Sequence, residues 1–224
     1  MCRFALYLGE PTPLSSLITE PVNSLINQSY HSKERIEPLN GDGFGVAWYY
    51  HGAPAAFRST TPAWNNRNHR AISRVTESGA VLAHVRAATP GLPVTELNCH
   101  PFVVGRLSFM HNGHLGGFSI LRRALLAELS DEAFARIEGS TDSEHIFAVL
   151  LDHMAEYTDL EPAARLLAAM EATIATVEAL RRTHAPDHHS LLNLVVCDGE
   201  RAVISRYTSS EVVANTLYYA VGRS

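Results

Sequence analysis

Cysteine is scarce in this sequence, and long hydrophobic runs and clusters of basic residues are absent. Its 224 residues include only three cysteines, Cys2, Cys99 and Cys197, which are far apart and form no C-x-x-C pair. An odd, dispersed set argues against a disulfide framework or zinc ribbon and favours a reducing, cytoplasmic location. No stretch approaches the roughly 18 apolar residues of a membrane-spanning helix, and the N-terminal segment lacks a signal-peptide pattern.

Basic residues are also too few and too dispersed for a nucleic-acid or anionic-membrane surface. Lys and Arg total 18 against 23 Asp and Glu, a formal net charge of −5. Hydrophobic residues make up 46% and charged residues 18%, which is typical of globular proteins whose cores need no disulfide or structural metal. We therefore expect one domain over residues 1–224 that acts on a small molecule, with neither nucleic acid nor membrane as a partner.

Short apolar segments bounded by Gly, Pro and Asn predict strands at both ends of the chain. The expected strands are 2–9, 46–50, 55–59, 80–89, 107–111, 191–197, 202–207 and 216–221, with Asp198-Gly199 as a tight hairpin turn. Helical periodicity predicts helices over 119–137, 141–157 and 160–183. Residues 10–40 are expected to be irregular. Strands on either side of a helical block favour a single α+β domain with mainly antiparallel sheets.

Cys2 is the first candidate for chemistry, because removal of Met1 would leave a thiol and a free α-amine on one residue. Their ordinary pKa values are roughly 8.5 and 7.7–8.0, so the amine can take the thiol proton near neutral pH. The structural alternative is that Cys2 merely begins a buried strand. In isolation that alternative is favoured, so a catalytic role for Cys2 requires further active-site motifs elsewhere in the sequence.

Two further motifs have both a structural and a functional interpretation. Arg86 ends an apolar segment, where its guanidinium needs an anion, either a carboxylate of the protein or one of a substrate. Asn112-Gly113 is a common hairpin turn. Its side-chain amide and backbone N–H could instead form an oxyanion hole.

Residues 140–144 predict a helix start, since Thr141 and Glu144 fit a capping box. Asp142 would lie in the first turn, where a carboxylate suits the helix dipole and could bind a substrate ammonium group. The glycine-rich segment 41–45 precedes a strand, which disfavours a dinucleotide or phosphate loop and favours a tight turn near the active centre.

The 12 histidines show no spacing typical of a metal site. The close pairs are His111 with His114 and His188 with His189, and no H-E-x-x-H or Cys/His set accompanies them. His100 could line a site or serve the core. We expect no metal and no cofactor.

In order and spacing, these motifs resemble the class-II glutamine amidotransferases. The matching segments are Cys2, Arg86-Ala-Ala-Thr89, Asn98-Cys-His-Pro-Phe102, His111-Asn-Gly113 and Thr141-Asp-Ser-Glu144. One departure is Ala87, where many larger members have Trp. The glycine-rich loop is similar to that of the short, stand-alone bacterial branch, which includes relatives of the γ-glutamyl hydrolase of ergothioneine synthesis.

The resemblance implies a four-layer αββα N-terminal-nucleophile fold, with two stacked antiparallel sheets between helical layers. It also implies a role for each matching residue. These roles are Cys2 as nucleophile with its own α-amine as base, Asn112 and Gly113 as oxyanion hole, Arg86 for the substrate α-carboxylate, Asp142 for its α-ammonium, Thr89 in a loop closing over glutamine, and His100 in the pocket lining.

The leading hypothesis is hydrolysis of the γ-amide of L-glutamine or a γ-glutamyl compound through a Cys2 thioester, which releases ammonia or an amine. Residues 10–40 and 60–75 are the expected pocket walls. Because the sequence contains no synthase domain, we expect ammonia to be released or passed to a synthase partner. The sequence ends just after the predicted strand 216–221, which would fit a C-terminal truncation. The alternatives are a non-catalytic glutamine-binding relative and an unrelated cysteine hydrolase built on Cys99 or Cys197.

Overall fold

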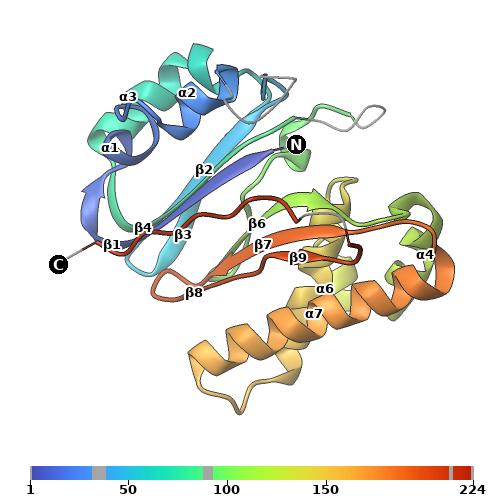
Figure 1. Ribbon diagram of the computed structural model, residues 1–224. Helices are drawn as coiled ribbons and strands as arrows, with labels where there is room; N and C mark the ends of the chain where they lie inside the picture. The colour runs from blue at the N-terminus through green and yellow to red at the C-terminus, as the bar shows by residue number, and fades with distance from the viewer. Residues whose placement is uncertain (1, 32–38, 88–92, 212–213, 223–224) are drawn as a thin grey trace.

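Two antiparallel sheets stacked face to face, each covered by helices on its outer side, form the framework of the protein (Figure 1). The computed structural model describes residues 2–31, 39–87, 93–211 and 214–222. The arrangement of layers is αββα, so the fold predicted from the resemblance is confirmed.

The first sheet has the strand order β1-β4-β2-β3 and is antiparallel throughout. Its strands are β1 (Arg3–Pro13), β2 (Phe44–Tyr50), β3 (Ala53–Ser59) and β4 (Glu77–Val85). Because β4 lies between β1 and β2, its C-terminal end has the N-terminus of the chain on one side and the glycine-rich turn on the other.

Short helices cover the outer face of this sheet, two of them within residues 10–40, which the sequence predicted to be irregular, and two within residues 60–75. They are α1 (Leu14–Ile18), α2 (Leu25–Tyr30), the 3-10 helix η1 (Ala63–Asn65) and α3 (Arg67–Val75). Side-chain caps start two of them: Ser24 accepts from the Asn27 N–H, and Asn66 accepts from the His69 N–H. The irregular structure predicted for residues 10–40 is wrong at α1 and α2, because helices this short show little periodicity, and packing onto a sheet supplies their stability.

The second sheet has the order β5-β6-β7-β8, with β9 also pairing with β7. Its strands are β5 (Phe102–Val104), β6 (Leu107–His114), β7 (Leu191–Cys197), β8 (Ala202–Ile204) and β9 (Tyr207–Thr208). Within it, Asn112 lies opposite Asn193 and Gly113 lies opposite Leu192. The hairpin-turn interpretation of Asn112-Gly113 is therefore wrong, since both residues belong to β6. The predicted turn at Asp198-Gly199 does connect β7 to β8.

Helices α4 (Phe118–Glu128), α6 (Asp142–Glu156) and α7 (Pro162–His184) cover the second sheet (Figure 1). The predicted helix over 119–137 is in fact two, because the chain turns at Ser130, whose hydroxyl caps the short α5 (Asp131–Phe134). Another 3-10 helix, η2 (Glu96–Asn98), precedes β5. No helix in the described ranges is long and apolar enough to cross a membrane.

The predicted strand over 216–221 does not form, because residues 214–222 pair with no strand that the structure describes. Tyr219 and Val221 are 90% and 88% exposed, so their apolar surface is not packed against a sheet. The segment instead passes the second sheet, where the Asn193 side chain donates to the carbonyl of Asn215 (3.3 Å).

Side-chain alternation brings four polar or reactive residues to one end of the space between the sheets. Leu6, Leu82, Met110 and Val195 pack together between the sheets. Since alternate residues of a strand share a face, positions two or four residues away along the same strands face the same space. Those positions are Asn112 in β6, Asn193 in β7, and Cys2 and Arg86, which lie one residue beyond the ends of β1 and β4.

Candidate active site

The Cys2 thiol lies against the chain just beyond the end of β4. The Ala87 N–H donates to its Sγ (3.4 Å), and the Ala87 carbonyl oxygen is 3.6 Å from the same sulfur. Burial raises the pKa of this thiol, and the negative charge of Asp142 raises it further. The Ala87 hydrogen bond and the positive charge of Arg86 lower it in part. A thiol held mostly protonated at neutral pH needs a nearby base to become a nucleophile.

Arg86 is a buried cation without an anionic partner in the described part of the chain. Its side chain belongs to a residue only 4% exposed, and its guanidinium makes long contacts of 3.4–3.5 Å with the carbonyl oxygens of Pro93 and Asp42. No carboxylate of the described residues forms an ion pair with it. Because an unpaired buried charge is costly, this geometry favours an anionic ligand over a structural carboxylate.

The glycine-rich turn before β2 fixes the backbone of Arg86. The Arg86 N–H donates to the Gly43 carbonyl (2.8 Å), and the Asp42 N–H donates to the Arg86 carbonyl (3.1 Å). Gly43 has φ +113°, and a Cβ there would lie 2.7 Å from the Cys99 sulfur. Only glycine fits this position, and the predicted tight turn is present next to Arg86.

Asp142 is the first residue of α6 and is held by backbone N–H groups. Its Oδ2 accepts from the Leu115 N–H and its Oδ1 from the Ser143 N–H, both at 2.8 Å. Its charge acts on the Cys2 thiol, as does that of Arg86. A fixed carboxylate and a buried guanidinium thus both act electrostatically on the same sulfur.

The capping box predicted at the start of α6 is only half formed. Thr141 Oγ1 accepts from the Glu144 N–H (3.3 Å), as predicted. The Glu144 carboxylate, however, accepts from the N–H groups of Glu138 (2.9 Å) and Gly139 (2.7 Å). These hydrogen bonds shape the loop before the helix, and spacing alone could not show which backbone groups the carboxylate would bind.

Asn112 presents its amide at the end of the interlayer space. Its Oδ1 is buried without a hydrogen-bond partner among the described residues, as is the Oδ1 of Asn193 on the neighbouring strand. At Gly113 a Cβ would collide with the Leu191 carbonyl, so the close approach of β7 requires glycine. The pair therefore combines a side-chain amide whose oxygen has no partner in the described residues with a residue that must lack a side chain.

Three buried histidines lie behind these groups. The rings of His84 and His100 have centroids 4.3 Å apart, and His84 Nε2 is 3.2 Å from the His111 carbonyl oxygen. Burial lowers the pKa of His84 to about 3, and it also lowers the pKa values of His100 and His111. All three rings are therefore neutral at physiological pH and weakly basic.

His111 and His100 differ in how their ring nitrogens are used. His111 engages Ser143 Oγ (2.9 Å) and the Leu191 carbonyl oxygen (3.0 Å). His100 has no partner on either ring nitrogen in the described residues. No cluster of three or more His, Cys, Asp or Glu side chains in the same ranges could hold a metal ion.

Among the seven predicted site residues, Arg86 and Asp142 act electrostatically on Cys2, Arg86 also acts on His100, and Asn112 and Gly113 lie near the end of β6. Thr89 lies outside the described residues. Asn98 was part of a matching motif but received no predicted role. Its side chain donates to the Pro93 carbonyl (3.0 Å) and accepts from the Ser140 N–H (2.9 Å). It thereby connects a carbonyl at the Arg86 guanidinium to the loop before Asp142. The signal that could have identified it is a polar residue within an otherwise apolar motif.

Comparison with known proteins gives concordant results. A family model described as class-II glutamine amidotransferases matches residues 18–220. A Saccharomyces cerevisiae protein named "Probable glutamine amidotransferase DUG3" is 40% identical, over 100% of this chain and 69% of its own length. The gamma-glutamyl-hercynylcysteine sulfoxide hydrolase of Mycolicibacterium smegmatis is 31% identical over 84% of both chains.

Solved structures are similar as well. A glutamine aminotransferase class-II domain protein from Silicibacter pomeroyi is 31% identical, with a TM-score of 0.69, and the match covers 96% of this chain and 80% of that one. The glutamine phosphoribosylpyrophosphate amidotransferase of B. subtilis is 14% identical, with a TM-score of 0.53 over 92% of this chain and 37% of its own. The second likeness concerns the fold alone.

Proposed function

This chain belongs to the class-II glutamine amidotransferases, and we propose that it hydrolyses the γ-amide of L-glutamine or of a larger γ-glutamyl compound through a thioester on Cys2. The observation that carries the proposal is the buried Arg86 guanidinium, which lacks a carboxylate partner in the described residues and acts on the same thiol as Asp142. We further propose that residues 1–224 work as one catalytic domain from which Met1 is removed.

Arg86 and Asp142 would hold the two charged ends of the substrate. The guanidinium binds the α-carboxylate, and the Asp142 carboxylate binds the α-ammonium. Both side chains act electrostatically on Cys2, which supports a substrate bound with its amide carbon near Sγ. Fixing the amide in this way converts a collision between two molecules into a positioned attack.

The α-amine of Cys2 would serve as the base. It takes the thiol proton, and the thiolate attacks the amide carbon. Its main competitors are disfavoured, because low pKa values make His84, His100 and His111 poor proton acceptors. The protonated amine then donates its proton to the leaving nitrogen, and the C–N bond breaks.

Asn112 and Gly113 would stabilise the oxyanion of the tetrahedral intermediate. The side-chain amide and the backbone N–H are the two donors, each worth roughly 3–4 kcal/mol when aimed at the developing charge. Water then attacks the thioester with the same α-amine as base, which releases glutamate and restores the thiol. The product nitrogen leaves as ammonia or an amine.

The test is release of glutamate and ammonia from glutamine by purified protein, with the N-terminal residue identified by intact mass. We expect active wild-type protein to begin at Cys2 and the Cys2→Ala variant to be folded and inactive. Cys197→Ala is the matched control and should retain activity. Active protein that keeps Met1 would contradict the mechanism. Glutamine binding without turnover by correctly processed protein would favour the non-catalytic alternative.

A further inference from the structure

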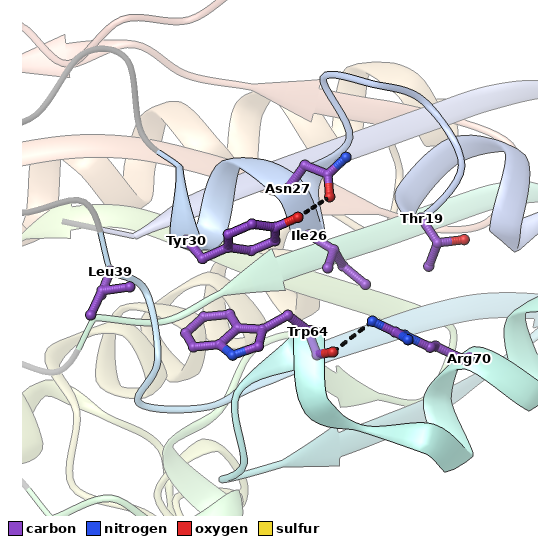
Figure 2. Close-up of a pocket in the computed structure, with 7 residues that line it drawn as sticks. All are labelled: Thr19, Ile26, Asn27, Tyr30, Leu39, Trp64 and Arg70. Carbon is purple, nitrogen blue, oxygen red and sulfur yellow. Dashed lines mark hydrogen bonds between the residues drawn. The ribbon is translucent and has the colours of Figure 1, made fainter.

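A cavity of about 580 Å³ lies in the outer helical layer that covers the first sheet (Figure 2). Its walls include Ile26, Tyr30, Leu39, Trp64 and Arg70, which come from α2, η1, α3 and the segment before the glycine-rich turn. All lie within the two segments that the sequence predicted as pocket walls. The volume is in the range of cavities that hold small organic molecules.

The cavity has an aromatic wall. Tyr30 and Trp64 meet edge to face, with ring centroids 5.8 Å apart and an interplanar angle of 64°. The Tyr30 hydroxyl donates to Asn27 Oδ1 (2.8 Å), which fixes the orientation of that ring (Figure 2). With Ile26 and Leu39 beside them, these rings suit an aromatic or large apolar group.

Arg70 gives the same cavity a positive charge. Its Nη2 donates to the Trp64 backbone carbonyl (2.7 Å), so the guanidinium is held at the backbone of the residue that carries the indole (Figure 2). No carboxylate in the described ranges pairs with it, and its remaining N–H groups can bind one from a ligand. An apolar wall beside a cation is complementary to an apolar amino acid with a free carboxylate.

Both walls of the cavity are built on segments next to the candidate active site. The α2 carbonyl of Gln28 accepts from the side chain of Arg3, the residue after Cys2 (3.4 Å). A Cβ on Gly41 would lie 3.2 Å from the Trp64 ring. The next residue, Asp42, donates its N–H to the Arg86 carbonyl. The segments that form the cavity walls thus contact the residues next to Cys2 and Asp42 at one end of the first sheet.

We propose that this cavity receives the amine side of a γ-glutamyl amino acid whose side chain is aromatic or large and apolar. The inference rests on the proposed function. Water adds to the amide carbon by way of the thioester, the C–N bond breaks, and the released amino acid takes the proton on its nitrogen. Glutamine carries only hydrogen on its amide nitrogen and leaves the cavity unused.

Three substrates test the carboxylate contact: γ-L-glutamyl-L-phenylalanine, γ-L-glutamyl-phenethylamine, which lacks the carboxylate, and glutamine. In Arg70→Gln the side chain can still donate to the Trp64 carbonyl but has no charge. We expect the kcat/KM ratio of γ-glutamyl-phenylalanine to glutamine to fall about fivefold. The ratio for the phenethylamine amide should not change. Arg74→Gln, an exposed arginine one turn along α3, is the matched control and should alter neither ratio.

Trp64→Ala tests the aromatic wall. The kcat/KM ratios of both aromatic amides to glutamine should fall about tenfold, because the variant removes apolar contact area for the ring. Trp64→Phe should restore most of the loss and keeps the test valid if the alanine variant folds poorly. Tyr50→Ala, an aromatic that is 68% exposed on the β2–β3 hairpin, is the control.

The inference and the function on which it rests fail in different ways. Wild-type protein that hydrolyses glutamine but neither aromatic amide would overturn the proposed cavity role and leave the function standing. Unchanged ratios in both Arg70→Gln and Trp64→Ala would do the same. Processed protein that hydrolyses none of the three substrates would overturn the proposed function itself.

Discussion

The two ends of the space between the sheets are built from the same strands and differ in chemistry. At one end Leu82, Met110 and Cys197 pack in an apolar cluster. The Tyr49 hydroxyl there donates to the Cys197 carbonyl (2.7 Å) and also contacts Ser108 Oγ and the Arg106 carbonyl oxygen (both 2.9 Å). This end joins the two sheets with its polar groups satisfied.

The other end is polar and poorly satisfied. It holds a buried guanidinium without an ion pair in the described residues, and buried polar atoms without partners on His84, His100, Asn112 and Asn193. Such groups cost stability unless a ligand or water engages them. The contrast indicates that stability is concentrated at one end of the interlayer space and substrate binding at the other, as is common at functional sites.

Asn112→Ala should have the largest effect among substitutions around the nucleophile. An oxyanion donor acts only in the transition state, so kcat for glutamine should fall by about 100–1,000-fold with little change in KM. Steady-state kinetics provides the measurement. A rise in KM at constant kcat would instead assign Asn112 to ground-state binding.

Arg86→Gln should weaken substrate binding at the polar end without lowering the stability of the fold. Loss of the carboxylate contact should raise KM for glutamine by about 30–100-fold. Because the guanidinium has no structural ion pair in the described residues, the free energy of unfolding should stay the same or increase. Denaturant unfolding alongside kinetics checks both. A strongly destabilised variant would show that Arg86 serves the fold instead.

Met110→Ala should produce the reverse pattern at the apolar end. Truncating this fully buried side chain should lower the free energy of unfolding by about 2–4 kcal/mol. Turnover per folded molecule should stay within about twofold, since the residue faces the cluster of Leu82 and Val195. Loss of turnover without loss of stability would contradict the division between the two ends.

The polar end should also make stability depend on pH. The pKa of folded His84 is about 3, below its ordinary 6.5, so its contribution is complete above pH 6.5 and is lost as pH falls toward 3. His84 therefore adds a slope of about 1.4 kcal/mol per pH unit over that window. His84→Gln should reduce the measured slope by about that amount. An unchanged slope would mean that the pKa of His84 in the folded protein is close to its ordinary 6.5.

The sequence could predict the residues of the candidate site better than their surroundings. Cys2, Arg86 and Asp142 were candidates because each stands in a short motif at the end of a strand or the start of a helix, and the resemblance implied their roles. The sequence left two interpretations of Asn112-Gly113, a hairpin turn and an oxyanion hole, because the partner strand lies about 80 residues further along the chain. The pairing of Asn112 with Asn193 excludes the turn. Local sequence carries no information on a partner that distant.

The cavity walls show the same limit. The segments around Tyr30 and Trp64 were predicted to border a pocket, but the helices that present these rings were not predicted. Ser24 and Asn66, the caps of α2 and α3, are visible in the sequence, but η1 has no side-chain cap, and packing against the sheet stabilises such short helices. The meeting of Tyr30 with Trp64, and the placement of Arg70 beside them, depend on that tertiary packing.

The most direct test of the central proposal is to trap the acyl-enzyme. Protein should be mixed with glutamine, quenched in acid within one turnover, and analysed by peptide mass spectrometry. We predict one γ-glutamyl group in thioester linkage on a peptide that begins with Cys2, absent from Cys2→Ala and unaffected by Cys197→Ala. Turnover with the acyl group on another residue would contradict the proposal.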